Sequence, residues 1–136
     1  MKNYMGLVVI GLVVASSAFA SGFKCEGDSG YRVKLYNHRN TETRVPAKMI
    51  ISHEDAGTLL VADESEISKT NRANTVRYTV DGNRKIQAEQ AILQIAFKEG
   101  RETLGKGKTA EGQLILVGDE DREVFDLTCV RYLVGE

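Results

Sequence analysis

The segment YRVKLY, which starts at Tyr31, alternates apolar or aromatic side chains with basic ones. In an extended chain, Tyr31, Val33 and Leu35 fall on one side, whereas Arg32 and Lys34 fall on the other. A period of two is typical of a β-strand with one buried face and one face in water. The segment therefore predicts a strand of an antiparallel sheet whose basic side chains face solvent.

The same period recurs towards both ends of the chain. Further strand candidates are residues 23–25, 47–51, 58–61, 75–80, 113–117 and 123–133. Within 75–80, we expect Val76, Tyr78 and Val80 to face inward. In the last candidate, Phe125, Leu127 and Cys129 share a face with Arg131. Because a charged side chain is unexpected on an apolar face, a bulge or a strand end is predicted near Arg131. 

Residues 87–98 have two interpretations. As a strand, the segment would direct Leu93, Ile95 and Phe97 inward. As a helix, it would present a stripe of alanine and isoleucine side chains and end at Gly100. Its neighbours are strand candidates, so the strand is favoured. Residues 100–112 are charged and rich in glycine, and they predict a long mobile loop.

Turn-forming residues separate the expected strands. Gly27–Gly30, residues 81–83 and Gly118–Arg122 are typical of turns in their glycine, aspartate and asparagine content. Seven or eight short strands with such spacing predict an all-β fold, a small antiparallel barrel or sandwich. Closure into a barrel would also remove exposed sheet edges. We expect one such domain, over residues 21–136.

The first twenty residues have the composition of a secretory signal peptide. Lys2 is followed by an apolar or glycine run over residues 5–15 and then by Ala18-Phe19-Ala20. We expect cleavage after Ala20, because the run is too short to span a bilayer as a retained anchor. The processed chain, with no other long apolar segment, is then expected to be exported, to the periplasm or the exterior, without a membrane span.

The processed chain would contain two cysteines, Cys25 and Cys129. Paired thiols persist as disulfides in the oxidising compartments that exported proteins reach. A bond between them closes a loop of about 104 residues, for which the chain-entropy model gives about 4.7 kcal/mol. The alternative is a redox pair, but the chain has no Cys-x-x-Cys spacing. A structural disulfide joining the first and last strands is therefore predicted.

The charge balance narrows the function classes. The chain has 18 basic and 19 acidic residues and a formal net charge of −1, which does not suit a strongly basic nucleic-acid-binding protein. His38 and His53 are the two histidines, and neither lies in a recognised metal-ligand spacing. We therefore expect no nucleic-acid partner, no metal and no cofactor.

Residues 25–30 (CEGDSG) resemble the nucleophile segment of chymotrypsin-like serine proteases over six residues. That family places its histidine and aspartate well upstream of the serine. Ser29 is only the ninth residue after the expected cleavage site. The segment is therefore predicted to be a hairpin turn, and no enzymatic activity is expected.

Basic residues on the solvent side suggest one interaction surface. Arg32, Lys34 and Arg77 are expected on the outward face of two strands, with Tyr36 nearby. Such a stripe can meet an acidic protein or a polyanionic component of the cell envelope. An ordinary solvated sheet face remains the alternative.

Several features together resemble the periplasmic inhibitors of c-type lysozyme. These are the export signal, the early segment 23–25, the strand 33–36, Gly57-Thr58-Leu59 and the late Cys129. The resemblance implies a small β-barrel with a terminal disulfide that inserts a loop into the cleft of an enzyme. Residues 73–78 (ANTVRY) occupy the position of the inhibitory segment.

Three functional hypotheses follow from these features. The leading one is an exported, non-enzymatic β-domain that acts as a binding or envelope-associated module. The second is an inhibitor of a cell-wall hydrolase, and the third is a small carrier of hydrophobic ligands inside the barrel. The partner and the oligomeric state are left open.

Overall fold

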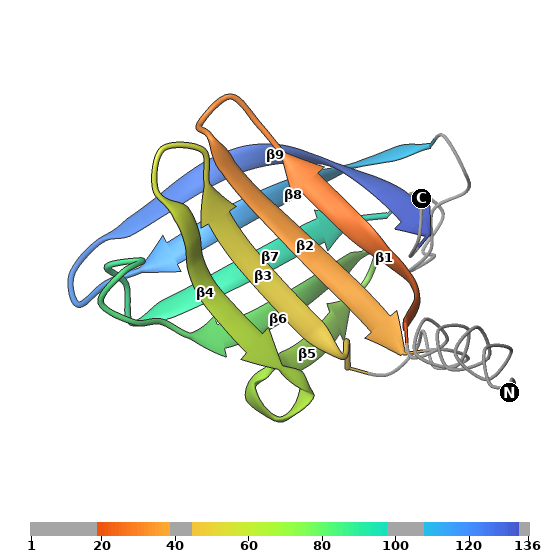
Figure 1. The fold of residues 1–136 in the computed structure, drawn as a ribbon, viewed down its shortest axis with the longest axis horizontal. Helices are drawn as coiled ribbons and strands as arrows, with labels where there is room; N and C mark the ends of the chain where they lie inside the picture. The colour runs from red at the N-terminus through yellow and green to blue at the C-terminus, as the bar shows by residue number, and fades with distance from the viewer. Residues whose placement is uncertain (1–18, 39–44, 98–107, 134–136) are drawn as a thin grey trace, which may run out of the picture.

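The computed structural model describes residues 19–38, 45–97 and 108–133. This part of the chain forms nine strands and one short 3-10 helix, which confirms the predicted all-β class and adds one strand to the expected seven or eight (Figure 1). The elements are β1 (Phe19–Glu26), β2 (Tyr31–His38), β3 (Lys48–His53), β4 (Gly57–Asp63), η1 (Glu64–Glu66), β5 (Ser68–Arg72), β6 (Thr75–Asp81), β7 (Gln90–Ala96), β8 (Thr109–Val117) and β9 (Arg122–Leu133).

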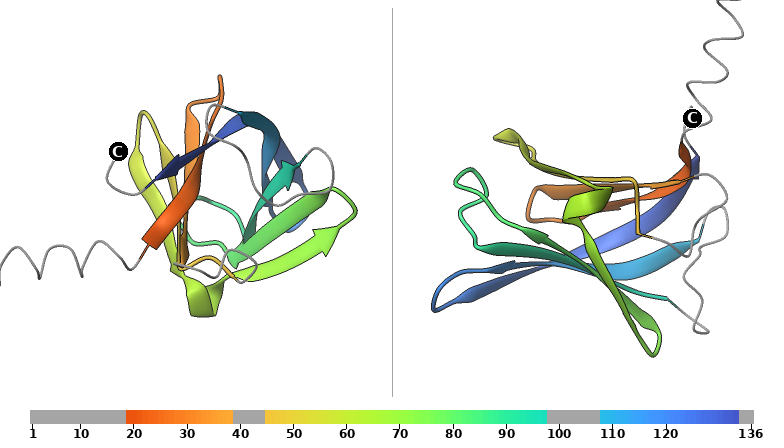
Figure 2. Two further views of the ribbon diagram at one scale, coloured as in Figure 1. Left: turned by 90° about the vertical axis from the view of Figure 1, so that its right-hand side faces the viewer. Right: turned by 90° about the horizontal axis from the view of Figure 1, so that it is seen from below.

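All nine strands belong to one antiparallel sheet. Their order is β4-β3-β2-β1-β9-β8-β7-β6-β5, so β1 pairs with β9 and the two ends of the meander meet in the middle of the sheet. The sheet curls around one interior into a half-barrel whose edges are β4 and β5 (Figure 2). The short η1 connects these two edge strands.

The predicted disulfide lies where the meander closes on itself. Cys25 and Cys129 are direct cross-strand partners on β1 and β9, and both are fully buried. The bond joins residues separated by 104 positions. Gly112 on β8 makes room for it, because a Cβ atom at that position would lie 2.7 Å from Cys129 Sγ. The predicted covalent link between the first and last strands is confirmed.

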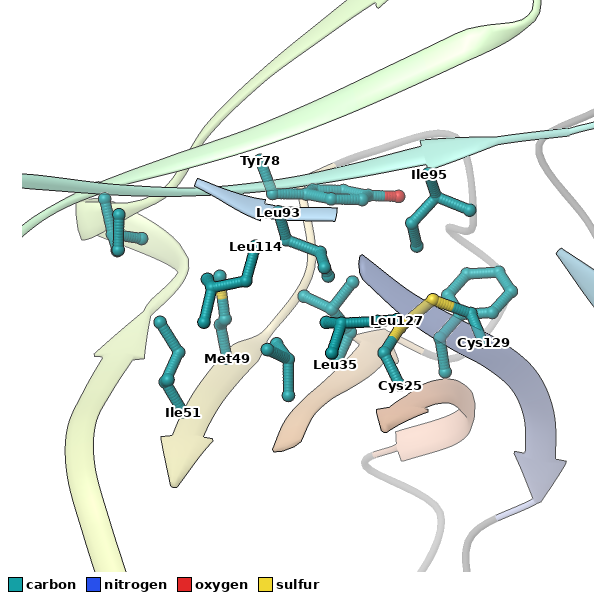
Figure 3. Close-up of a cluster of buried hydrophobic side chains, with 14 of the residues drawn as sticks. Cys25, Leu35, Met49, Ile51, Tyr78, Leu93, Ile95, Leu114, Leu127 and Cys129 are labelled. Carbon is teal, nitrogen blue, oxygen red and sulfur yellow. A yellow bond between two sulfur atoms is a disulfide. The ribbon is translucent and has the colours of Figure 1, made fainter. Parts of the chain in front are cut away.

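The interior is filled by the side chains that the alternation predicted to point inward. Val33, Leu35, Leu93 and Ile95 have no exposed area. Figure 3 shows the core side chains of β2 and β3 meeting those of β6, β7 and β8 beside the disulfide. Burial of each such aliphatic side chain contributes about 1.5–3 kcal/mol. The predicted inward positions Val76, Tyr78, Val80, Phe97 and Leu127 are also buried.

The ambiguous segment 87–98 forms a strand. Gln90–Ala96 is β7, which pairs with β6 on one side and β8 on the other, so the helical alternative is wrong. Every second side chain, Ala91, Leu93 and Ile95, is buried in the core. Because β7 has a neighbour on each side, its backbone groups can form hydrogen bonds with both neighbours only when the segment is extended. The predicted turns at Gly27–Gly30 and after Val117 are confirmed.

One local expectation needs correction. Residues 109–112 were expected in a loop but begin β8, because they pair with β9, and Gly112 at the same time leaves room for the disulfide; residues 100–107 of that predicted loop lie outside the described residues. Near Arg131, where a bulge or a strand end was predicted, β9 shows no bulge against β1, but its pairing with β8 ends at Val130 and the strand itself ends at Leu133. Arg131 is exposed there because it lies beyond that last pair.

The predicted signal peptide, residues 1–20, lies largely outside the described residues, which begin at Phe19. Residues 1–18 carry most of the predicted signal peptide, so the structure does not test this expectation. Among the described residues, no helix has the length and apolarity needed to cross a bilayer.

Candidate functional site

The segment that resembles a protease nucleophile lies in the turn between β1 and β2, next to His53. Gly30 adopts a positive φ of 92°, and a Cβ atom there would lie 2.8 Å from His53 Nε2. His53 Nε2 lies 3.0 Å from the backbone carbonyl oxygen of Ser29. The backbone N–H of Asp55 donates to His53 Nδ1 at 3.1 Å. The fold thus brings the backbone of Ser29 next to His53, which lies 24 positions further along the chain, whereas Asp55 is a sequence neighbour of His53.

The hydrogen bonds of His53 give it a structural task. Because Nδ1 accepts from a backbone N–H, a neutral imidazole must carry its proton on Nε2 and donate it to the Ser29 carbonyl. Nε2 is then unable to accept a proton from the Ser29 hydroxyl, which itself accepts from the Tyr31 N–H at 3.4 Å. The nucleophile–base hydrogen bond that acyl-transfer triads require is therefore not formed in this geometry.

Aromatic packing fixes the same corner of the barrel. The Tyr31 ring contacts His53 edge to face, with centroids 4.8 Å apart, and Phe125 at 4.6 Å. Burial, with a smaller contribution from Glu123, raises the pKa of the Tyr31 hydroxyl above its usual value. The tyrosine is therefore neutral at physiological pH, and the corner joins the ends of β2, β3 and β9. The side chain of His38 lies outside the described residues.

The predicted basic surface is divided by the fold. Arg32, Lys34 and Tyr36 follow one another on the outer face of β2, between the buried side chains of that strand. Arg77 lies on β6, and the four strands β1, β9, β8 and β7 separate it from β2. The expectation that Arg77 shares one stripe with Arg32 and Lys34 is therefore not met, because strand order places it elsewhere on the sheet.

Arg77 instead belongs to a polar row on the other part of the sheet. Its Nε donates to Gln94 Oε1 at 2.6 Å across β6 and β7. Gln94 is the register partner of Gln113 on β8, and Gln113 is the partner of Asp126 on β9. Gln113 Nε2 donates to Asp126 Oδ1 at 3.2 Å. The row therefore crosses four strands with a cation at one end and a carboxylate at the other.

Two lysines outside the predicted interaction surface, Lys24 and Lys48, lie close to Lys34 on the outer side of the sheet. Lys24 on β1 lies directly opposite Lys34 on β2, and Lys48 on β3 lies opposite Tyr36. We call the outer side of these strands, with Lys24, Lys34, Tyr36 and Lys48, the basic face. The strands β1, β2 and β3 that carry it lie at the front of the view in Figure 1. Lys24 lies between buried Phe23 and Cys25, so the alternation of that short segment was sufficient to predict that Lys24 faces outward.

The charges of the basic face are poorly compensated. Two like charges directly opposite each other in an antiparallel pair destabilise the sheet, and Lys24 and Lys34 have this arrangement. Among the described residues, no carboxylate forms an ion pair with Lys24, Lys34 or Lys48. Arg32, which lies on the same side, pairs with Glu26 at 3.1 Å. A bound anion would relieve the repulsion between the lysines.

Asp63 is the carboxylate opposite Lys48 in register, but it has another task. Its side chain accepts from the Ser65 hydroxyl at 2.6 Å and the Ser65 N–H at 3.0 Å, which caps η1. The hydrogen bond from the Ser65 side chain is the main reason why the pKa of Asp63 is lowered. The carboxylate is therefore charged at neutral pH and held towards η1.

The chain was compared with protein-family models, with characterised proteins and with solved structures, and no match was found in any of the three.

Proposed function

We propose that this protein is an exported, non-catalytic binding module of the cell envelope, and that its basic face binds phosphate groups. The Lys24–Lys34 cross-strand pair carries the proposal, because its repulsion is unfavourable in the free protein and is relieved by an anion. Lys48 lies on the diagonal from Lys34, about 7–8 Å away by sheet geometry. Three ammonium groups with this spacing suit a polymer or a surface that presents several phosphates.

The neighbouring side chains support contact with a surface. Ile50 lies next to Lys34 in register, and Val61 lies next to Ile50 on the edge strand β4. Val61 has 53% of its area exposed, although it is a large apolar residue. Lysines beside exposed apolar groups favour attraction to an anionic interface. The buried disulfide supports export, since such bonds persist in oxidising compartments.

The triple variant Lys24→Gln/Lys34→Gln/Lys48→Gln is expected to bind anionic vesicles about 100-fold more weakly than the natural protein. The estimate assumes about 1 kcal/mol for each lysine near an anionic surface. Binding is measured by co-sedimentation with phosphatidylglycerol-containing vesicles and by titration with soluble polyphosphate, each at two salt concentrations. Preference for vesicles identifies lipid headgroups as the phosphate source, and preference for polyphosphate identifies a free polyanion.

The matched control is Arg84→Gln/Lys85→Gln, which removes two exposed cations from the loop between β6 and β7. This variant should keep the affinity of the natural protein. If the control and the triple variant lose affinity equally, or if neither anionic probe binds at low salt, the proposal is wrong. Hydrolysis of ester, peptide or glycan substrates that is lost in His53→Ala would contradict the non-catalytic part.

The hairpin between β5 and β6 favours inhibition of a cell-wall hydrolase as a second candidate. Ala73 and Asn74 form its exposed tip, and Ala73 has a φ of 53°, a left-handed conformation that alanine rarely adopts. Strained residues at exposed tips are often part of a functional loop. The tip also begins the stretch that the resemblance to lysozyme inhibitors implies as inhibitory.

Titration of the natural protein into a c-type lysozyme assay tests this second candidate. Inhibition is expected at stoichiometric protein, and Arg72→Ala/Asn74→Ala should abolish it because both exposed side chains flank the strained residue. The vesicle-binding control Arg84→Gln/Lys85→Gln should inhibit normally. Absence of inhibition at a large molar excess would remove the candidate.

The carrier hypothesis receives less support from the packing. Leu35, Met49, Ile51 and Leu114 have no exposed area and occupy the described interior together with the disulfide (Figure 3). A ligand inside the half-barrel would have to displace these side chains, so we do not propose a carrier function.

A further inference from the structure

A recess of about 520 Å³ lies on the outer face of β7, β8 and β9, beside the turn between β1 and β2. Its polar side chains are Asp28, Gln94, Glu111, Gln113, Asp126 and Thr128. Those on the strands alternate with interior residues, so they point away from the core. The volume lies within the range of about 300–1,000 Å³ that small-molecule sites occupy.

The backbone around the recess explains why it is hollow. A Cβ atom at Gly27 would collide with the backbone carbonyl of Asp126, so glycine allows the β1–β2 turn to pack against β9 and form one wall. Ala96, with its short side chain, lies opposite Glu111 and leaves the floor open. The recess is therefore built by strand packing and by two small residues.

The two glutamines in the recess are held in defined orientations. Arg77 donates to Gln94 Oε1, so the amide NH₂ of Gln94 is the group left for a ligand. Gln113 donates through Nε2 to Asp126, so its Oε1 is left as an acceptor. Thr128 adds a hydroxyl, which both donates and accepts. The recess thus presents fixed donors and acceptors side by side, without the need to order long side chains on binding.

The carboxylates surround the recess but do not converge on one point. Glu111 pairs in register with Thr128, so Asp126 is its diagonal neighbour across β8 and β9, about 7–8 Å away. Calcium and magnesium ligands lie within about 2.0–2.6 Å of the ion. In the part of the chain that the structure describes, no three acidic, histidine or cysteine side chains are grouped to hold a metal ion. The spacing suits separate hydroxyl groups of a larger molecule.

We propose that this recess binds a polyhydroxylated ligand of about one to two sugar rings, a glycan unit without acidic groups. Sugar hydroxyls donate to the carboxylates and to Gln113 Oε1, and they accept from the Gln94 amide and from Thr128. Hydrogen bonds to ionised acceptors are the stronger ones. Asp28, Glu111 and Asp126 repel an acidic sugar, and none of the described residues that line the recess is a cation that would offset them. The recess uses other residues than the basic face, although the two adjoin, since Thr128 pairs with Glu26 on β1 and Lys24 is its diagonal neighbour.

The test is a titration of the ¹⁵N-labelled natural protein with cellobiose, N-acetylchitobiose and digalacturonic acid, followed by amide chemical shifts. The two neutral disaccharides should shift the amides around Gln94, Gln113 and Thr128 with dissociation constants of about 1 mM or below. Digalacturonic acid should leave these amides unchanged. The proposal is overturned if neither neutral disaccharide shifts them at about 10 mM, or if the acidic disaccharide shifts them equally.

Variants separate this site from the basic face. Gln113→Ala and Gln94→Ala should each weaken binding of the neutral disaccharides by about tenfold, as expected for loss of one oriented hydrogen-bonding group. Amide spectra with the same dispersion as that of the natural protein would show that both variants are folded. The triple lysine variant should bind the disaccharides normally. Equal disaccharide binding by all the variants would contradict the assignment to the recess.

Discussion

Replacing Cys25 and Cys129 with alanine is expected to lower the free energy of unfolding by about 2–5 kcal/mol. The disulfide joins residues 104 positions apart, so its loss frees nearly the whole described chain in the unfolded state. In the folded state both sulfurs are buried, and the substitution also leaves a cavity beside Gly112. At its upper end, this loss equals the whole stability of the least stable small domains, whose range is about 5–15 kcal/mol.

Urea denaturation, followed by circular dichroism, measures the effect. The double variant is compared with the natural protein in both its oxidised and its reduced form. The reduced natural protein should unfold close to the double variant, because both lack the covalent link. A loss smaller than about 1 kcal/mol would show that β1 and β9 stay paired without it. The link would then not be what stabilises the closure of the meander.

Replacing Leu93 with alanine is expected to destabilise the protein by about 2–5 kcal/mol. Leu93 on β7 and its cross-strand partner Leu114 on β8 both have no exposed area and lie at the centre of the core (Figure 3). Removal of the side chain loses its burial and leaves a cavity that the paired strands are unable to close. Thermal and urea denaturation measure the loss.

Val124→Ala is the matched control for Leu93→Ala. Val124 lies on the outer face of β9 with 49% of its area exposed, so its truncation should change the stability by no more than about 0.5 kcal/mol. Equal effects of the two substitutions would mean that the inside and the outside of the sheet have been assigned incorrectly. That result would also remove the basis for placing the basic face and the recess on the solvent side.

The two proposed sites use different parts of one outer surface. The basic face lies over β1, β2 and β3, where Lys24 and Lys34 oppose each other. The recess lies over β7, β8 and β9 and carries carboxylates. With this charge separation, the proposed sites give the protein one region suited to phosphate and another suited to uncharged glycan. Both chemistries occur in cell envelopes, so the two sites together are compatible with one location.

Much of the fold was predictable because the signal is local. The alternation around Val33 and Leu35 and around Val76 and Tyr78 identified strands and their buried faces correctly. The pairing of Cys25 with Cys129 followed from their number and from the expected compartment. The loop predicted over 100–112 was wrong at its end. Gly112 disfavours a strand when judged from sequence alone, but β8 needs a glycine there because the Cys129 sulfur from β9 occupies the space of a side chain.

The candidate sites were less predictable because they depend on which strands are neighbours. Arg77 has the same outward position in its strand as Lys34 has in β2, so the alternation alone did not distinguish them. His53 and Ser29 lie 24 positions apart and meet only because β2 pairs with β3. Gln94, Gln113 and Asp126 carry no motif, and their register brings them into one row.

By itself, the amino-acid sequence predicted most of the strands, the side of them that is buried, and which cysteines are joined, since each depends on side-chain periodicity or on the number of thiols. It did not predict β5, whose residues Ser68–Arg72 are mostly exposed and show no apolar alternation. The tertiary structure alone decided the order of the strands and their register. Strand order depends on how β1 meets β9 after the whole meander has formed, and no short segment contains that information. The grouping of Lys24, Lys34 and Lys48, and the recess on the far strands, both follow from it.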